Sequence, residues 1–468
     1  MLTSLSYEFL LWTIVVLFGI NIIYAIIKIR KRFLYLFFQI AIFTFLLSRP
    51  FIELCQGIGV EGMAGPILEG RKFVLVALIS VEIFLLAGAI LCEKFGGKII
   101  DKITLKNNES ENDFGKNLQI VALCICIVTL GLYLLQQLEP LLTIGTQNYL
   151  AYYTSFESKL PGIVHTIASF MKYSLCIYLA TLPKKRSAFI MLAVYVLSTI
   201  PSLMVGMRNP FVLSLLFALS YYLLRDFLEK KNIWVGKVEK ALMCIGIPVG
   251  MIAMIMYSFF RAGVDVTVTN PLSLIVDFFH QQGVTFDVAV TGYSYRAELI
   301  NRCPVNYTFG GIIDYIYRGT VGQKLFGTLP LTAGNSEFNA THSNSLAHVL
   351  SYVADQDRYA IGGGLGSSFI LETYIDFGYI GIIVFSLILG ALLIFMVQGF
   401  GKRVLLTAIV LYALTNIFFA PRAEATGWLT FIVTIQFWAC VAACYLGAYI
   451  CTKFNIFERI FKKGKALE

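Results

Sequence analysis

Long apolar runs separated by short polar segments make up most of this 468-residue chain. The hydrocarbon core of a bilayer is ~30 Å thick and needs about 20 apolar residues per helix, and transmembrane β-strands are much shorter. About eleven runs approach or exceed this length, and each predicts a membrane-spanning helix. They lie at residues 7–27, 33–50, 73–92, 118–138, 162–182, 187–205, 210–225, 240–260, 378–397, 404–420 and 429–451. The pattern predicts an all-α polytopic membrane protein.

One long polar stretch, residues 261–367, interrupts this series. It holds three of the four histidines, namely His280, His342 and His348. We expect it to form one large loop of short helices on the outer side of the membrane. The chain then divides into a first bundle of about eight spans (1–260), this loop (261–367), about three last spans (368–452) and a cytoplasmic tail (453–468).

Composition agrees with a membrane protein, with 58% hydrophobic and 14% charged residues and a mean hydropathy of +0.76. A typical soluble domain carries about 25% charged residues. The net charge of +9 does not indicate nucleic-acid binding, because most lysines and arginines form short clusters between spans. Under the positive-inside rule these clusters place the N-terminus and the long loop outside and the C-terminus in the cytoplasm.

No metal-ligand framework is visible in the sequence. Most of the ten cysteines lie inside apolar runs, where they behave as small hydrophobic residues. His342 and His348 are six residues apart, so on a helix they would not share a face as two metal ligands do. We therefore expect no metal or other cofactor.

Three arginines stand at the outer ends of predicted spans: Arg208 in GMRNPF, Arg261 in FFRAGVD and Arg422 in APRAEATGW. A guanidinium is permanently charged and donates paired hydrogen bonds, which suits phosphate and pyrophosphate groups. The alternative is that these arginines reach to the interface or form structural ion pairs, for instance Arg422 with Glu424. Two further charges, Lys172 and Glu82, fall within spans and are either functional or an ion pair with each other.

The loop and the spans beside it also contain residues that could move a proton. His342 lies in THSNSLAHVLSY and is the first candidate for a general base, because histidine titrates near neutral pH. The alternative is a hydrogen-bonded loop histidine. Glu372, in ETYIDFG, follows the glycine-rich stretch that closes the loop.

Several local motifs resemble those of the O-antigen polymerase (Wzy-type oligosaccharide repeat-unit polymerase) family. They are GMRNPF before a span, the arginine that ends the span before the loop, and GGGLGSSFILETYIDFGYIGIIVFSLILG. The segment HSNSLAHVL is similar to the histidine–asparagine segment of the O-antigen ligases, which are more distant relatives. The likeness in layout, with many spans and one large outer loop late in the chain, covers essentially the whole sequence.

The resemblance implies a GT-C-like integral membrane glycosyltransferase of the bacterial inner membrane. Such an enzyme joins undecaprenyl-pyrophosphate-linked oligosaccharide units by moving the growing chain onto a new lipid-linked unit. It releases undecaprenyl pyrophosphate and needs no metal. The implied partners are the lipid-linked oligosaccharides and the bilayer, together with a chain-length regulator and a flippase.

The resemblance also assigns expected roles to residues of this chain. Arg208, Arg261 and Arg422 would bind the pyrophosphate, and His342 would be the base, with Glu424 and Glu372 in reserve. Sugar-binding residues are expected at Tyr315, Arg318 and His348. Two alternatives remain: an O-antigen ligase, which would use the same arginines and base, and a transporter of polysaccharide or lipid-linked sugar. A transporter would instead favour charges near the bilayer centre and internal repeats.

Overall fold

The computed structural model describes residues 6–58, 65–104, 111–146, 149–229, 233–262, 271–302 and 305–455. The described residues are 81% helical and contain no strand. Eleven helical stretches of the described residues are long and apolar enough to cross a membrane. The predicted all-α polytopic fold and the predicted number of spans are therefore confirmed.

Several of the spans are built from more than one helical segment. The first eight comprise α1 (Tyr7–Ile27), α2 (Ile29–Ile42) with the π-turn η2 (Phe43–Leu47) and α3 (Ser48–Cys55), α4 (Pro66–Thr104), α5 (Glu111–Ile144), α7 (Gly162–Ala180), α8 (Lys185–Leu197) with α9 (Ile200–Val205), α10 (Asn209–Leu228) and α11 (Lys237–Ala262). The last three comprise α20 (Phe369–Gly399), α21 (Val404–Leu414) with the 3₁₀ turn η3 (Ile417–Arg422), and α22 (Ile435–Lys453). A second 3₁₀ turn, η4 (Gly427–Val433), leads into α22.

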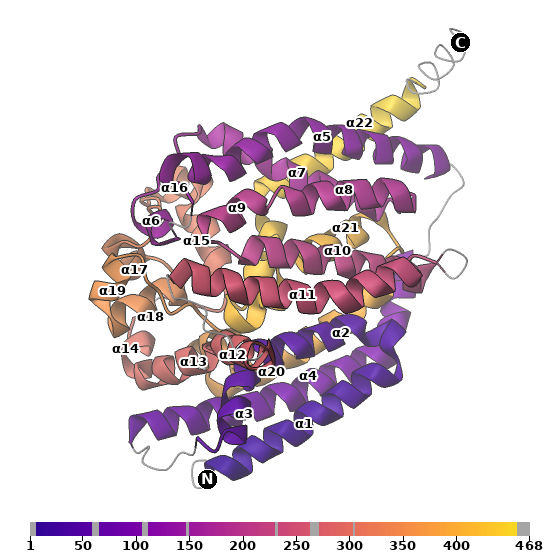
Figure 1. The fold of residues 1–468 in the computed structure, drawn as a ribbon. Helices are drawn as coiled ribbons and strands as arrows, with labels where there is room; N and C mark the ends of the chain where they lie inside the picture. The colour runs from indigo at the N-terminus through magenta and orange to yellow at the C-terminus, as the bar shows by residue number, and fades with distance from the viewer. Residues whose placement is uncertain are drawn as a thin grey trace.

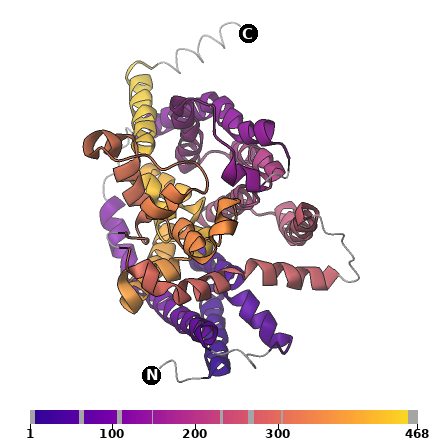
Figure 2. The ribbon, with the colours of Figure 1, turned by 90° about the vertical axis from the view of Figure 1, so that its left-hand side faces the viewer.

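Short helices gather at one end of the bundle of spans (Figure 1). Figure 2 looks onto that end, where the orange and salmon helices cover the ends of the spans. Most of them come from the stretch between α11 and α20. One, α6 (Tyr149–Thr154), comes from earlier in the chain. The others are α12 (Pro271–Gln282), α13 (Thr285–Ser294), α14 (Arg296–Ile300), α15 (Gly310–Arg318), α16 (Thr320–Phe326), α17 (Glu337–His342), α18 (Leu346–Ala354) and α19 (Gln356–Ala360).

The late span α20 packs directly against the early span α4, backbone to backbone. A Cβ atom added to Gly88 would lie 1.9 Å from the carbonyl oxygen of Leu387, and one added to Gly390 would lie 2.0 Å from that of Leu85. Small residues allow such close approach between membrane helices. Gly378 then bends α20 with a positive φ of 64°, so that the first part of α20 departs from the line of the span.

The two charged residues within spans have separate surroundings. The carboxylate of Glu82 accepts a hydrogen bond from the Gln39 amide at 2.9 Å. The ammonium of Lys172 lies 5.5 Å from the ring centre of Tyr133 and 5.9 Å from that of Tyr195. Because no ion pair joins them in the described residues, the structure contradicts the alternative of a Lys172–Glu82 pair.

Candidate functional site

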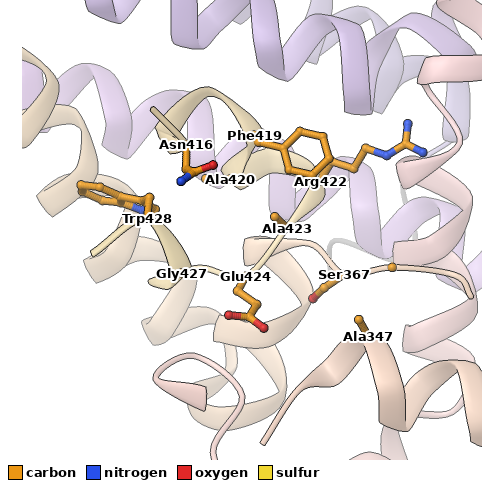
Figure 3. Close-up of a pocket in the computed structure, with 11 residues that line it drawn as sticks. Ala347, Ser367, Asn416, Phe419, Ala420, Arg422, Ala423, Glu424, Gly427 and Trp428 are labelled. Carbon is orange, nitrogen blue, oxygen red and sulfur yellow. The ribbon is translucent and has the colours of Figure 1, made fainter. Parts of the chain in front are cut away.

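A pocket of about 330 Å³ opens where span α21–η3 meets the short helices (Figure 3). Its walls come from α18, from the segment just before α20, and from the chain around the turn 423–426 between η3 and η4. The lining residues are Ala347, Gly366, Ser367, Asn416, Phe419, Ala420, Arg422, Ala423, Glu424, Gly427 and Trp428. Loop and span thus contribute to one cavity.

Glu372 stabilises the turn 423–426 through a hydrogen bond to its backbone. Its side chain is fully buried in the first part of α20. One carboxylate oxygen accepts the backbone N–H of Ala425 at 2.7 Å, and the other accepts the Ser367 hydroxyl at 2.5 Å. The Trp428 indole N–H closes the same turn on the carbonyl of Ala425 at 2.9 Å. Because both oxygens of Glu372 serve the local fold, we interpret this residue as a support for the turn, and its role as a base stays a prediction.

Glu424 projects from this supported turn, and its carboxylate has no hydrogen bond or ion pair among the described residues. Two glycines make room for it: a Cβ on Gly311 would lie 2.9 Å from its Oε2 atom, and one on Gly427 would lie 3.1 Å away. Burial and the nearby charge of Asp314 raise the pKa of Glu424 above its ordinary value. A carboxylate that is poorly solvated and lines a pocket is a candidate for proton transfer.

Asp314, on α15, supplies the fixed negative charge beside Glu424. Its two oxygens accept the backbone N–H of Asn344 at 2.8 Å and the Asn344 side-chain amide at 2.7 Å. The Nε atom of Arg318, one turn later on α15, lies 4.0 Å from Asp314. These donors fix the orientation of the Asp314 carboxylate. The sequence analysis did not select this residue, although the i,i+4 spacing of Asp314 and Arg318 was a usable signal.

Arg422 lies two residues before Glu424 and lines the same pocket. The two side chains point in different directions (Figure 3), and the ion pairs of the described residues do not include one between them. An Nη1 hydrogen of Arg422 is donated to the Gln282 side chain at the end of α12, with an N···O distance of 3.2 Å, and its guanidinium lies 5.8 Å from the Phe45 ring centre. The expected alternative, an Arg422–Glu424 ion pair, is therefore wrong.

The family model for O-antigen polysaccharide polymerase Wzy matches residues 1–455 of the chain. The chain belongs to the Wzy family. This confirms the resemblance, and it makes the protein an enzyme that polymerises O-antigen repeat units carried on lipid in a membrane. Neither a curated protein nor a solved structure matches the chain.

Two of the three predicted sugar-binding residues of this Wzy protein gather around Asp314. Arg318 is its i,i+4 neighbour, and the pKa of His348 is lowered by burial, an effect that the charge of Asp314 partly opposes. The Nδ1 atom of His348 lies 2.8 Å from the Tyr359 hydroxyl. The third, Tyr315, donates its hydroxyl hydrogen to Gln436 at 2.8 Å and so joins the short helices to the start of α22.

The predicted base His342 lies apart from the pocket of the Wzy protein. It is the last residue of α17, it is exposed, and its ring stacks on Phe338 with 4.4 Å between ring centres. The Arg318 guanidinium lies 5.7 Å from the ring centre of the same Phe338. His342 is not among the described residues that line the pocket, and its role as the base stays a prediction.

Of the two other predicted pyrophosphate-binding arginines, Arg208 is not among the described residues that line the pocket. Arg208 is the N-cap of α10, directly after the turn that Gly206 makes with a φ of 117°. Arg261 is in the last turn of α11, and its side chain lies outside the described part of the structure. Among the described residues, no three His, Cys, Asp or Glu side chains are grouped as a metal site requires.

Proposed function

We propose that this Wzy protein polymerises undecaprenyl-pyrophosphate-linked oligosaccharide repeat units by block transfer. The growing glycan would leave its lipid carrier and join the terminal sugar of a new lipid-linked unit. One observation supports this proposal above the others. Arg422 lines the pocket together with the Glu424 carboxylate, which has no hydrogen bond or ion pair among the described residues. The pocket lies at the end of a span, where a polar headgroup and an acyl chain would meet.

The proposed reaction needs one base and one cationic group. A hydroxyl oxygen of the acceptor sugar attacks the anomeric carbon of the donor glycan, and the bond from that carbon to the pyrophosphate oxygen breaks. Glu424 takes the hydroxyl proton and later returns it to water. Arg422 stabilises the negative charge that develops on the departing pyrophosphate, in a role for which Arg208 and Arg261 are further candidates.

We rank Glu424 before His342 as the base because of their surroundings. Glu424 lines the pocket and has a raised pKa, whereas His342 is exposed and stacked on Phe338. A higher pKa makes a carboxylate a stronger base toward a sugar hydroxyl. Glu372 supports the turn, and Arg318 and His348 are proposed to bind the acceptor glycan near Asp314.

The proposal includes a place for the protein in the cell. Membership of the Wzy family suggests the bacterial inner membrane. The clusters of lysine and arginine between spans favour an orientation with the N-terminus and the short helices outside and the C-terminus in the cytoplasm. A GT-C-like ancestry, metal independence, and contacts with a chain-length regulator and a flippase are part of the same proposal.

Deletion of the gene tests the proposed function in the cell. Without a polymerase, surface polysaccharide should be reduced to single repeat units that remain attached to their final acceptor. A wild-type copy should restore the ladder of longer chains on a gel. Loss of even the single-unit band would instead indicate the ligase or the transporter alternative.

The pH dependence of chain extension tests the carboxylate pair in vitro. As the pH rises through the raised pKa of Glu424, the base becomes ionised, so the rate should rise with pH along an acidic limb. Asp314→Asn removes the negative charge that raises this pKa, so the limb should move to lower pH. Initial rates on lipid-linked repeat units, measured with reconstituted protein, give both curves.

Asp357→Asn is the matched control, because this exposed aspartate on α19 is not part of the pocket wall. Its acidic limb should coincide with that of the wild type. An unmoved limb in Asp314→Asn, or one moved to higher pH, would show that Glu424 does not set the pH dependence.

A further inference from the structure

The hairpin formed by α15 and α16 carries an unusually apolar exposed surface. Within α16 the one buried residue is Gly322, and the remaining apolar side chains face outward. The exposed apolar residues of the hairpin and of the irregular segment that follows it are Ile316, Tyr317, Val321, Leu325, Phe326 and Leu329. Single exposed apolar residues are ordinary, but a contiguous group of this kind marks a contact surface. We call this group the apolar hairpin face.

The apolar hairpin face is a built feature of the fold. A Cβ on Gly322 would lie 2.1 Å from the carbonyl oxygen of Ile316, so α16 can fold back on α15 only because glycine stands there. The rings of Tyr317 and Phe326 pack together with 5.0 Å between their centres. An Nη1 hydrogen of Arg318 is donated to the carbonyl of Leu329 at 3.1 Å and closes the hairpin. The outward direction of the apolar side chains is therefore fixed.

The hairpin is also bound to the start of span α22. The Tyr315 hydroxyl accepts the backbone N–H of Ile435 at 2.9 Å, and Ile435 is the first residue of span α22. Ile435 is 59% exposed and Trp438 is 43% exposed, so the outside of α22 is apolar from its first turn. Figure 2 shows short helices at the rim of the molecule beside the yellow α22. The apolar hairpin face thus begins where a lipid-facing surface begins.

We infer that the apolar hairpin face inserts into the adjoining lipid leaflet and anchors the hairpin as an interfacial element. Continuity with the outside of α22 favours acyl chains as the partner over a second protein. Tryptophan is typical of the membrane–water boundary, and Trp438 marks that boundary here. The exposed Lys324 on α16 has a side chain long enough to reach lipid headgroups while the apolar side chains are immersed.

The anchor has a consequence for the site, and this consequence rests on the proposed function. The same α15 that leads into the apolar face carries Asp314 and Arg318 toward Asn344 and Phe338. Insertion of the hairpin would hold these charged groups at the membrane surface, at the depth of a lipid pyrophosphate headgroup. The insertion itself does not depend on which reaction the protein catalyses.

Photolabelling of the full-length protein tests the insertion. The protein is reconstituted into phosphatidylcholine bilayers that contain a phospholipid with a diazirine on its acyl chain, irradiated, and analysed by peptide mass spectrometry. We expect labels in residues 316–329 at a level similar to the start of α22 and several-fold above the polar helix α19. Label on α22 without label on residues 316–329 would overturn the inference.

Two sets of variants make the test specific. The double substitution Leu325→Asn and Phe326→Asn should reduce labelling of the hairpin to the level of α19 and leave α22 labelled. Ile361→Asn changes a comparably exposed residue outside the hairpin, 63% exposed against 71% for Leu325, and should change nothing in residues 316–329. Labelling of the hairpin that survives the double substitution would also overturn the inference, because its apolar side chains would then not be the cause.

Discussion

Replacing Glu424 with glutamine should slow chain extension severely and leave the protein folded. Glutamine keeps the shape of the side chain and its fit between Gly311 and Gly427, but it cannot take a proton from the acceptor hydroxyl. A general base contributes roughly 10²–10⁴ to the rate, so the loss should be of that order. The measurement is the initial rate of repeat-unit addition by reconstituted protein, with binding of the lipid-linked unit measured separately.

The stability of this variant gives an independent check on the same side chain. The folded-state pKa of Glu424 is raised, so the protonated form is favoured in the fold, and ionisation destabilises the protein as the pH rises through that pKa. Near neutral pH the uncharged glutamine removes this cost. Glu424→Gln should therefore show a thermal unfolding midpoint equal to or above that of the wild type.

Parallel variants decide which residue is the base. Glu337→Gln, at an exposed position on α17, should retain full activity. His342→Ala should also retain activity if Glu424 is the base. If Glu424→Gln extends chains at a normal rate while His342→Ala does not, the base is His342 and the ranking proposed above is wrong.

The spans could be predicted from the sequence because membrane insertion depends on length and apolar composition, which are local properties. Arg422 and Glu424 could be selected for a similar reason: charges at the end of a span are costly and therefore conspicuous. Their shared pocket is consistent with that selection. The same local view also suggested an ion pair between them, which the different directions of the two side chains exclude in the described residues.

Contacts between distant parts of the chain could not be predicted. Asp314 gains its place in the site from Asn344, 30 residues later, and Glu372 meets Ala425 across 53 residues. No periodicity or motif encodes such pairings. His342 was selected as a base from its residue type alone. Residue type could not indicate that its ring would be exposed and stacked on Phe338. Which arginines act together likewise depends on tertiary contacts.

Replacing Arg422 with alanine should reduce chain extension by roughly 10²–10³, because the departing pyrophosphate would lose a cationic partner. Lysine should restore part of the rate, since it keeps the charge but lacks the planar fork that pairs with phosphate oxygens. The loss should fall mainly on kcat, because charge on the bridging oxygen of the leaving group grows in the transition state. Chain-length ladders in cells and initial rates in vitro both measure it.

A structural role of Arg422 would give a different result. If Arg422 binds the pyrophosphate, inhibition by added inorganic pyrophosphate should weaken in Arg422→Ala, and a merely misfolded protein would not show this selective change. Arg296→Ala is the control, because Arg296, on the short helix α14, donates to the carbonyl of Tyr293 and is not part of the pocket wall. Arg208→Ala and Arg261→Ala extend the series. If any two of the three proposed arginines can be replaced without loss of long chains, the pyrophosphate-binding role assigned to them is wrong.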